Sequence, residues 1–307
     1  MDGQVKIAFI ILTYNESKHL PRALQHIRDI AHEIFVVDSF STDNTVELAK
    51  DFGAQVLQHP FKNYATQFEW ALDHAPITSD WVVRLDADEI IEPDLAQELI
   101  TKLPSLPPTV TGVNLNRKTI FQGRFIRHGG RYPLTMLRVW RHGKARIENR
   151  WMDEHMYLTE GTTITLKGGF ADHNLNDLKF FTSKHVGYAS REALDVLNHR
   201  YHLFETQVEL TQKSTARQAK MKRFFKESLY NRIPFEISAF AYFLFRYVIQ
   251  LGFLDGREGL HYHVLQGFWY RFMVGAKLLE FEKALREAAT DDERRSAIAR
   301  LSHQELD

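Results

Sequence analysis

Trp81-Val82-Val83-Arg84-Leu85-Asp86-Ala87-Asp88-Glu89 is the stretch that decides the fold, because an apolar run ends there in closely spaced carboxylates. Side chains alternate along a strand, so a strand that continues through Asp88 would point Asp86 and Asp88 the same way. Two like charges that close repel each other, and a hard divalent cation holding phosphate oxygens relieves the repulsion. The stretch therefore predicts a metal site. The alternative is an acidic turn ahead of a helix that opens at Pro93.

The composition is that of a globular protein with an ordinary core. The chain has 307 residues, of which 44% are hydrophobic and 25% charged, enough for one large domain or two small ones. Lys+Arg and Asp+Glu balance at 39 each, so no net charge favours nucleic acid as a partner. The chain has no cysteine, which excludes disulfides and Cys-ligated zinc, and its first residues lack the pattern of a signal peptide. We therefore expect a cytosolic protein.

Apolar runs alternate with helical periodicity around the opening stretch. We expect strands at residues 6–13, 34–37, 54–57 and 81–86, with a helix after each of the first three, the first capped by Ser17. This alternation predicts an α/β fold with a Rossmann-like, mostly parallel sheet and helices on both faces. Ligands bind outside the carboxyl ends of such strands, where Thr13–Glu16, Asp38 and the two aspartates fall. No glycine-rich phosphate loop follows any strand, so we expect phosphate to be held through the metal.

Three segments resemble the family 2 inverting glycosyltransferases of the GT-A fold. They are Ile11–Glu16, Val37–Ser39 with Ser41–Thr45, and Leu85–Glu89. The resemblance implies a nucleotide-diphospho-sugar donor and a Mg²⁺ or Mn²⁺ ion on its diphosphate. It assigns donor binding to Thr13, Tyr14, Glu16, Asp38, Arg84 and Asp86, and metal binding to Asp86 and Asp88. Phe40 departs from the family pattern, in which a small or charged residue is more usual there, and receives no role.

The segments after the predicted sheet resemble the lipopolysaccharide-core glucosyltransferase branch. They are Trp151–His155 and Phe170–Asn174, and neither has the spacing of a helical two-histidine zinc site. The resemblance assigns the catalytic base to Glu154, with Asp153 as the nearest rival, and adds His173 to the metal ligands. An exposed acidic loop and an ordinary hydrogen-bonded loop histidine are the alternatives.

A basic, glycine-rich loop follows a further strand expected at residues 111–116. Its cationic residues are Arg124, Arg127, His128, Arg131, Arg138 and Arg141, interleaved with aromatic residues. Clustered arginines favour bidentate contacts to anions, although a solvated face would have the same composition. We assign Arg124, Arg127 and Arg131 to the binding of a phosphorylated acceptor.

The C-terminal third predicts helices of another character. A basic run at residues 213–226 precedes two aromatic-rich runs, Phe235–Leu254 and Leu260–Phe281. The first has the length to span a bilayer, but it contains Glu236 and Arg246, and this favours helices that lie on the membrane surface. A helical core or dimer interface and a spanning helix are the alternatives. We expect a catalytic domain at residues 1–178 and a helical, membrane-associated region at residues 179–307.

These patterns together predict a metal-dependent, inverting transfer of a sugar from a nucleotide-diphospho-sugar to a hydroxyl group. We expect the acceptor to be lipid-linked, a lipopolysaccharide or a surface polysaccharide, and the protein to be peripheral on the cytoplasmic face of the inner membrane, possibly as a homo-oligomer. A sugar-phosphate nucleotidylyltransferase would want a glycine-rich N-terminal loop, which is absent. A catalytically inactive, membrane-docked scaffold is disfavoured because both D-x-D acids and Glu154 are retained.

Overall fold

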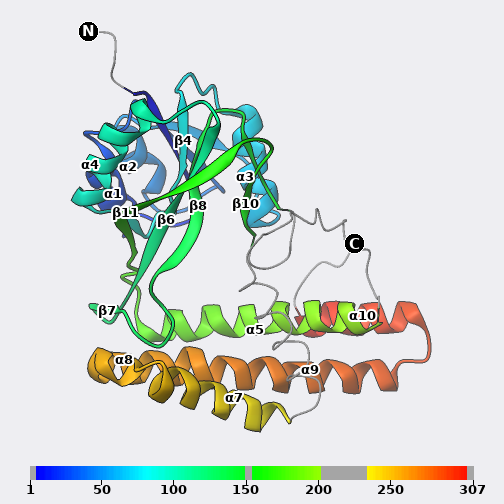
Figure 1. Ribbon diagram of the computed structural model, residues 1–307. Coiled ribbons are helices and arrows are strands. Elements are labelled where there is room, and N and C mark those ends of the chain that lie inside the picture. Colours follow the sequence, from blue (N-terminus) through cyan, green and yellow to red (C-terminus); the bar gives the residue numbers. More distant parts are fainter. Residues whose placement is uncertain (1–4, 149–153, 202–233, 303–307) are drawn as a thin grey trace. The chain divides into compact units, whose positions relative to one another are not determined.

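The computed structural model describes residues 5–148, 154–201 and 234–302 (Figure 1). They form two compact units, Met1–Leu175 and Asn176–Asp307. Asp153 and the basic run at residues 213–226 lie outside the described residues.

A nine-stranded sheet organises the first unit, in the order β3-β2-β1-β4-β8-β6-β11-β5, with β7 paired to β6. The strands are β1 (Ile7–Thr13), β2 (Glu33–Asp38), β3 (Gln55–Gln58), β4 (Trp81–Arg84), β5 (Glu89–Ile91), β6 (Val110–Phe121), β7 (Arg124–Ile126), β8 (Leu134–Arg141) and β11 (Thr162–Asp172). The first four neighbours, β3 to β4, are parallel, and β8 runs antiparallel between β4 and β6. The predicted α/β class is confirmed, with a sheet that is parallel in its first half and mixed beyond it.

Helices cover both faces of this sheet because its strands are apolar on both sides. They are α1 (Leu20–Ile27), α2 (Thr45–Asp51), α3 (Tyr64–His74) and α4 (Pro93–Lys102), the last continued by the 3₁₀ turn η1 (Leu103–Ser105). On one face Phe9 and Val83 pack with α1, α2 and α4. On the other face Ile10 and Val82 pack with Phe68 of α3 and with a two-stranded ribbon, β9 (Ala145–Ile147) and β10 (Met156–Leu158). Alternation along each strand thus places the two halves of the core.

Two local expectations were wrong. Strand β4 ends at Arg84, so Asp86 and Asp88 lie in a tight turn rather than on a strand, and the Glu89 amide donates to the Asp86 carbonyl at 2.9 Å. Helix α1 begins at Leu20 with His19, not Ser17, at its N-cap position, because the Ser17 amide donates to Asp43 Oδ2 at 3.2 Å and so belongs to a loop.

The second unit is helical, as predicted. It comprises α5 (Leu178–Tyr201), α7 (Phe235–Leu244), the π-helix η2 (Phe245–Ile249), the 3₁₀ turn η3 (Gly252–Asp255), α8 (Gly256–Tyr262), the π-helix η4 (His263–Trp269), α9 (Tyr270–Glu287) and α10 (Asp291–Ser302). Leu197, Phe281 and Ile298 form a buried core between α5, α9 and α10, while α7 packs against η4 and α9 (Figure 1). Among the described helices none is long and apolar enough alone to cross a membrane. The pair Phe235–Ile249 and Gly252–Glu287, bent by 72°, meets that test by length and composition only.

Candidate functional site

The loops that follow β1 and β2 are held together by side chains bonded to backbone. Asn15 Oδ1 accepts from the amides of Thr42 and Asp43 at 2.8 and 3.3 Å, and the Asn15 amide donates to Ser41 Oγ at 2.8 Å. Asn15 has a φ of 55°, a left-handed conformation that asparagine tolerates better than most residues. The Glu16 amide donates to Thr45 Oγ1 at 2.8 Å. The two loops therefore form one rigid edge at the carboxyl ends of adjacent parallel strands.

Asp38 is the centre of this edge. Its carboxylate accepts from Thr13 Oγ1 at 3.0 Å, from the Ser41 hydroxyl and amide at 2.5 and 2.9 Å, and from Gln58 Nε2 at 3.2 Å. Thr13 and Asp38 thus come together as the sequence predicts, but the Asp38 side chain is 0% exposed. A ligand would reach this carboxylate only if one of its donors moved away, so in this conformation Asp38 organises the loops.

Two aromatic side chains project from the same edge. Tyr14 is 59% exposed and Phe40 is 51% exposed. Phe40 has a φ of 59°, which is rare for a bulky residue. Next to them Glu16 is partly exposed, and its Oε2 lies 2.6 Å from Nδ1 of His19. Tyr14 and Glu16 are accordingly placed where a donor could touch them. From the sequence, Phe40 was noted only as a departure from the family pattern and was given no role.

The D-x-D turn begins with a carboxylate that is already surrounded by donors. Asp86 Oδ1 accepts from the Tyr64 hydroxyl at 2.5 Å and lies 3.7 Å from Arg84 Nε, while Oδ2 lies 3.4 Å from an Arg138 nitrogen. Burial alone would raise the pKa of Asp86, but Arg138 and Arg84 outweigh it and hold that pKa well below its usual range. Asp86 is therefore an anion at any physiological pH.

Glu89 and Arg138 form a buried pair beneath Asp86 that the sequence did not identify. Arg138 donates to Glu89 Oε1 at 2.7 Å, and Glu89 Oε2 accepts from the Asp86 amide at 2.9 Å. Glu89 is 1% exposed. Burial, with the nearby Asp86 carboxylate, raises the pKa of Glu89 to about 8, although Arg138 opposes the shift. The one signal in the sequence was a third acid directly after the D-x-D.

The predicted basic cluster is dispersed by the fold. Arg138 is buried against Glu89, and Arg141 donates to the carbonyls of Val110 and Leu106, both at 3.0 Å, while lying over the Trp81 ring. Arg138 is buried and Arg141 is half-buried, both on β8, an interior strand of the sheet. Arg124 and Arg127 are exposed and Arg131 is half-buried, all in or after β7.

Asp88 is bonded to the segment that follows β11. Its Oδ2 accepts from Asn174 Nδ2 at 2.9 Å, and its carbonyl accepts from the His173 amide at 3.0 Å. His173 Nδ1 lies 3.1 Å from an Arg22 nitrogen, and since a guanidinium only donates, Nδ1 accepts and the neutral ring keeps its proton on Nε2. Burial, together with Arg22, lowers the pKa of His173. The structure therefore brings His173 beside Asp88 as predicted, in a hydrogen-bonding role in this conformation.

The end of this segment also returns to helix α1. The Leu175 amide donates to His19 Nε2 at 2.9 Å, and the Leu175 carbonyl accepts from Lys18 Nζ at 2.5 Å. Residues 173–175 thus tie the D-x-D turn to the start of α1.

The donor set partly suits a divalent metal. Asp86 and Asp88 supply two carboxylates from one turn, the hard oxygen ligands that Mg²⁺ and Mn²⁺ prefer. Within residues 5–148, 154–201 and 234–302, however, no three His, Asp or Glu side chains come close enough together to hold a metal ion. Phosphate oxygens of a bound donor would have to complete the coordination.

Glu154 precedes β10 and is half-buried. The rival acid at position 153 lies outside the described residues, so the assignment of a base to this loop stays a prediction.

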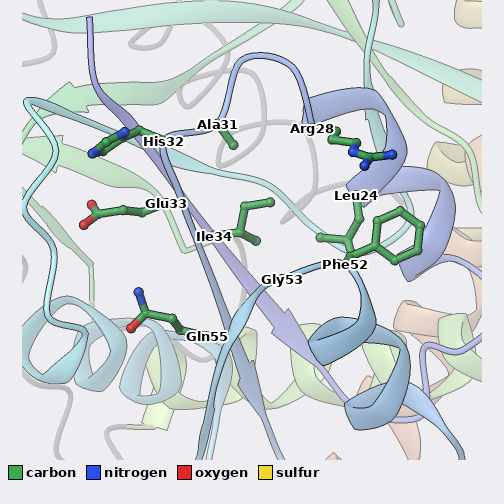
Figure 2. A pocket seen from close by; sticks show the side chains of 9 residues that line it. All are labelled: Leu24, Arg28, Ala31, His32, Glu33, Ile34, Phe52, Gly53 and Gln55. Carbon is green, nitrogen blue, oxygen red and sulfur yellow. The ribbon is translucent and has the colours of Figure 1, made fainter.

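A separate cavity of about 210 Å³ lies at the opposite edge of the sheet. Figure 2 shows its lining, which includes Glu33 and Gln55, the first residues of β2 and β3. The Glu33 carboxylate accepts from the hydroxyls of Thr78 and Ser79, both at 2.7 Å, and so serves the packing of a loop. This cavity is at the amino ends of the parallel strands, away from the D-x-D turn.

A mixed sheet whose parallel half has paired loops and a D-x-D turn at its carboxyl edge is the arrangement of GT-A glycosyltransferase domains. The chain belongs to glycosyl transferase family 2, whose family model matches residues 8–172. It is 40% identical over 94 residues to an uncharacterised glycosyltransferase of Rickettsia prowazekii, a match that covers 31% of this chain and 32% of the relative. It is 35% identical over 85 residues to the glycosyltransferase SunS of Bacillus subtilis, covering 26% of this chain and 19% of SunS.

The curated relatives are thus matched over about a third of their length or less. Among solved structures, glucosyl-3-phosphoglycerate synthase of Mycobacterium tuberculosis, in complex with Mn²⁺, UDP and glucosyl-3-phosphoglycerate, is 24% identical. That likeness covers 39% of this chain and 45% of the synthase, with a TM-score of 0.29.

Proposed function

We propose that this protein is a metal-dependent, inverting hexosyltransferase that uses a nucleotide-diphospho-sugar. The observation that supports it most is the D-x-D turn, which lies at the same sheet edge as the paired loops after β1 and β2. The donor would lie across Thr13, Tyr14, Glu16, Asp38, Arg84 and Asp86.

Asp86 and Asp88 would hold Mg²⁺ or Mn²⁺. When bound, such an ion supplies charge neutralisation for the nucleotide diphosphate that leaves. Asp86 suits this role because Arg84 and Arg138 keep its pKa low, so that no proton competes for the carboxylate. His173 would join the ligands only if Nδ1 exchanged its bond with Arg22 for another arrangement, since Nε2 carries the proton in the present one.

Inversion at the anomeric carbon needs one base and no covalent intermediate. We assign the base to Glu154, which would take the proton of the acceptor hydroxyl, with Asp153 as the rival. Arg124, Arg127 and Arg131 would hold a phosphorylated part of the acceptor. We propose a lipid-linked, lipopolysaccharide or surface-polysaccharide acceptor, met by a protein that is peripheral on the cytoplasmic face of the inner membrane.

The test separates donor binding from chemistry. Asp88→Asn should abolish Mn²⁺-dependent binding of UDP-, GDP- and dTDP-sugars across a panel, with an unfolding midpoint in metal-free buffer close to that of the wild type. Glu154→Gln should bind the preferred donor with unchanged affinity yet lose on the order of a hundredfold in turnover, the usual contribution of a positioned base. Normal donor binding by Asp88→Asn would refute the metal site. Near-normal turnover in Glu154→Gln with collapse in Asp153→Asn would move the base by one residue.

A further inference from the structure

The segment Phe235–Trp269, here the apolar hairpin, presents apolar side chains to solvent. Its first arm is α7 with η2 and its second arm is α8 with η4, joined through residues 250–255. From Ile237 to Asp255 every exposed side chain is apolar: Ile237, Phe240, Ala241, Leu244, Phe245, Val248, Ile249, Leu251, Phe253 and Leu254. Ile249, at the end of the first arm, is 69% exposed. A contiguous apolar surface of this kind marks an interaction site.

The charged residues between Ile237 and Asp255 are buried instead of exposed. Arg246 and Asp255 are the only charged residues between Ile237 and Asp255, and they are 4% and 2% exposed. The Arg246 guanidinium lies 5.5 Å from the centroid of the Tyr242 ring. A water-exposed helix buries apolar side chains and exposes charges, so this stretch is inverted relative to that rule.

The joint between the two arms is closely packed, so the outward position of the apolar side chains is fixed by the structure around the joint. A Cβ at Gly252 would lie 2.6 Å from the His263 ring, and one at Gly259 would lie 2.6 Å from Asp255 Cβ. His263 is 0% exposed. Polar groups therefore fill the interior of the joint, and the apolar side chains cannot turn inward to replace them.

Basic residues that precede the hairpin in the sequence or follow its joint indicate what covers the apolar face. In the sequence before the hairpin, the run at residues 213–226, which lies outside the described residues, contains no acid and six basic residues: Lys213, Arg217, Lys220, Lys222, Arg223 and Lys226. Directly after the joint, Arg257 and His261 are exposed. Basic residues beside an apolar face complement anionic lipid headgroups above acyl chains, whereas a second copy of this chain would bring the same positive charge.

We propose that the apolar hairpin inserts its exposed face into one leaflet of an anionic bilayer without crossing it. A transverse path would place Arg257 and His261 in hydrocarbon, whereas a hairpin lying within one leaflet lets them reach the headgroups. The helical stretches Phe235–Ile249 and Gly252–Glu287 are bent by 72°, a geometry that fits a re-entrant path as well as a broken span. The inference extends the membrane part of the proposed function and is independent of its donor chemistry.

The absence of cysteine allows a direct test of depth. Ile249→Cys and, as a matched control, Leu279→Cys would each carry a polarity-sensitive fluorophore, since Leu279 on α9 is likewise exposed, at 53%. With vesicles rich in phosphatidylglycerol at low salt, the label at 249 should shift to the blue and be quenched by lipids spin-labelled on the acyl chain, and the label at 279 should do neither. A label at 249 that stays in water, or equal quenching at both positions, would overturn the proposal.

Flotation with the same vesicles tests the face as a whole. Phe245→Ser combined with Ile249→Ser should lower the bound fraction about tenfold or more, because two apolar side chains lose their burial in lipid, while Leu279→Ser should float like the wild type. Trypsin added outside the vesicles should still remove the C-terminal residues of bound protein. Protection of those residues would mean a spanning pair. If the wild type does not float and the double serine variant no longer self-associates, the apolar face is a dimer interface. Either result refutes the inference.

Nucleotide-sugar binding by these variants, measured without lipid, should equal that of the wild type. A wild type that binds the donor but does not float would therefore refute only the insertion of the hairpin into the bilayer. A wild type that binds no donor would refute the proposed transferase.

Discussion

Phe40 holds a backbone conformation that costs free energy and returns little burial. Its φ of 59° lies in the left-handed region, yet its side chain is 51% exposed. Residues kept in such conformations cluster at functional sites, where the surroundings enforce them. The neighbouring bonds of Ser41 to Asp38 and Asn15 are what enforce it here.

We expect Phe40→Gly to raise the free energy of unfolding by about 0.5–1 kcal/mol, because glycine adopts positive φ without steric cost. Denaturant titration measures the change. Phe61→Gly is the matched control: Phe61 is 58% exposed but has no positive φ, so that variant should gain nothing. Equal effects of the two substitutions would show that Phe40 is not strained.

Glu89 predicts a pH dependence of stability. Its pKa rises from 4.5 to about 8 in the folded state, so the protonated form favours folding. The stabilisation is complete below the unfolded pKa and is lost as the pH rises through the folded pKa. Asp86 acts in the opposite sense: with its folded pKa lowered from 3.8, its contribution is present above that value and lost in acid. The two windows therefore do not overlap.

Glu89→Gln should remove the first dependence while keeping an acceptor for Arg138. Between about pH 5 and pH 8 the free energy of unfolding of the variant should gain on that of the wild type, by up to ~1.4 kcal/mol per pH unit. Parallel pH profiles for the two proteins would contradict a raised pKa. Glu287→Gln, at a side chain that is 68% exposed, should follow the wild type throughout.

For single residues, the sequence predicted positions that a local pattern determines and missed contacts that depend on the pairing of distant strands. Thr13, Asp38 and Asp86 follow directly from the ends of apolar runs. Arg138 could not be placed, because it reaches Glu89 only through the antiparallel insertion of β8 beside β4, 49 residues away along the chain. A pattern of arginines and aromatics says nothing about which strand will be interior.

Among the elements, β11 and α4 meet at Gly168, a position where any larger side chain would have no room. A Cβ at Gly168 would lie 2.6 Å from Leu95 Cα, within the helix backbone. Gly168 also falls in the irregular stretch where the register of β11 against β6 shifts, between Thr165 and Gly169. Helix α4 can therefore lie close to the strand only because this residue is glycine.

Gly168→Ala should lower the free energy of unfolding by on the order of 2 kcal/mol, since an overpacked contact with backbone cannot relax by a rotamer change. Gly187→Ala provides a control of opposite sign. Gly187 lies inside α5 with nothing within 4 Å of its Cβ position, so alanine should add roughly 0.5–1 kcal/mol through helix propensity. Thermal or urea unfolding of the two variants decides, and a Gly168→Ala protein as stable as the wild type would disprove the contact.

The elements that the sequence predicted well are those with a long apolar period. Strands β1 and β2 begin and end within one residue of their expected bounds. Strand β5 has three residues and exists only through its pairing with β11, whose partner residues are about 80 positions away. Nothing local in Glu89–Ile91 distinguishes such a strand from the acidic turn that the sequence also allowed.

Among the described residues, the apolar cores of the two units share no residue. One contains Phe9, Leu24 and Val83 around the sheet, and another contains Leu197, Phe281 and Ile298 among the C-terminal helices. The predicted donor and metal residues from Thr13 to His173 belong to the first unit. The membrane role of the second unit stays a prediction.

Calorimetry of the intact chain should accordingly resolve two unfolding transitions. A nucleoside diphosphate with Mn²⁺, at a hundredfold excess over its Kd, should stabilise one of them by about 2.7 kcal/mol and leave the other in place. Asp88→Asn should abolish that shift without moving either transition in metal-free buffer. One transition that moves as a whole would show that the units unfold together.

The bonds of residues 173–175 set a boundary for anyone who excises the catalytic unit. The family match ends at residue 172, yet Asn174 holds Asp88 and Leu175 is bonded to Lys18 and His19. A fragment trimmed to residues 8–172 would lose Ile7 of β1 and, more importantly, the hydrogen bonds of residues 173–175 that hold the D-x-D turn. The smallest fragment that retains these hydrogen bonds ends no earlier than Leu175.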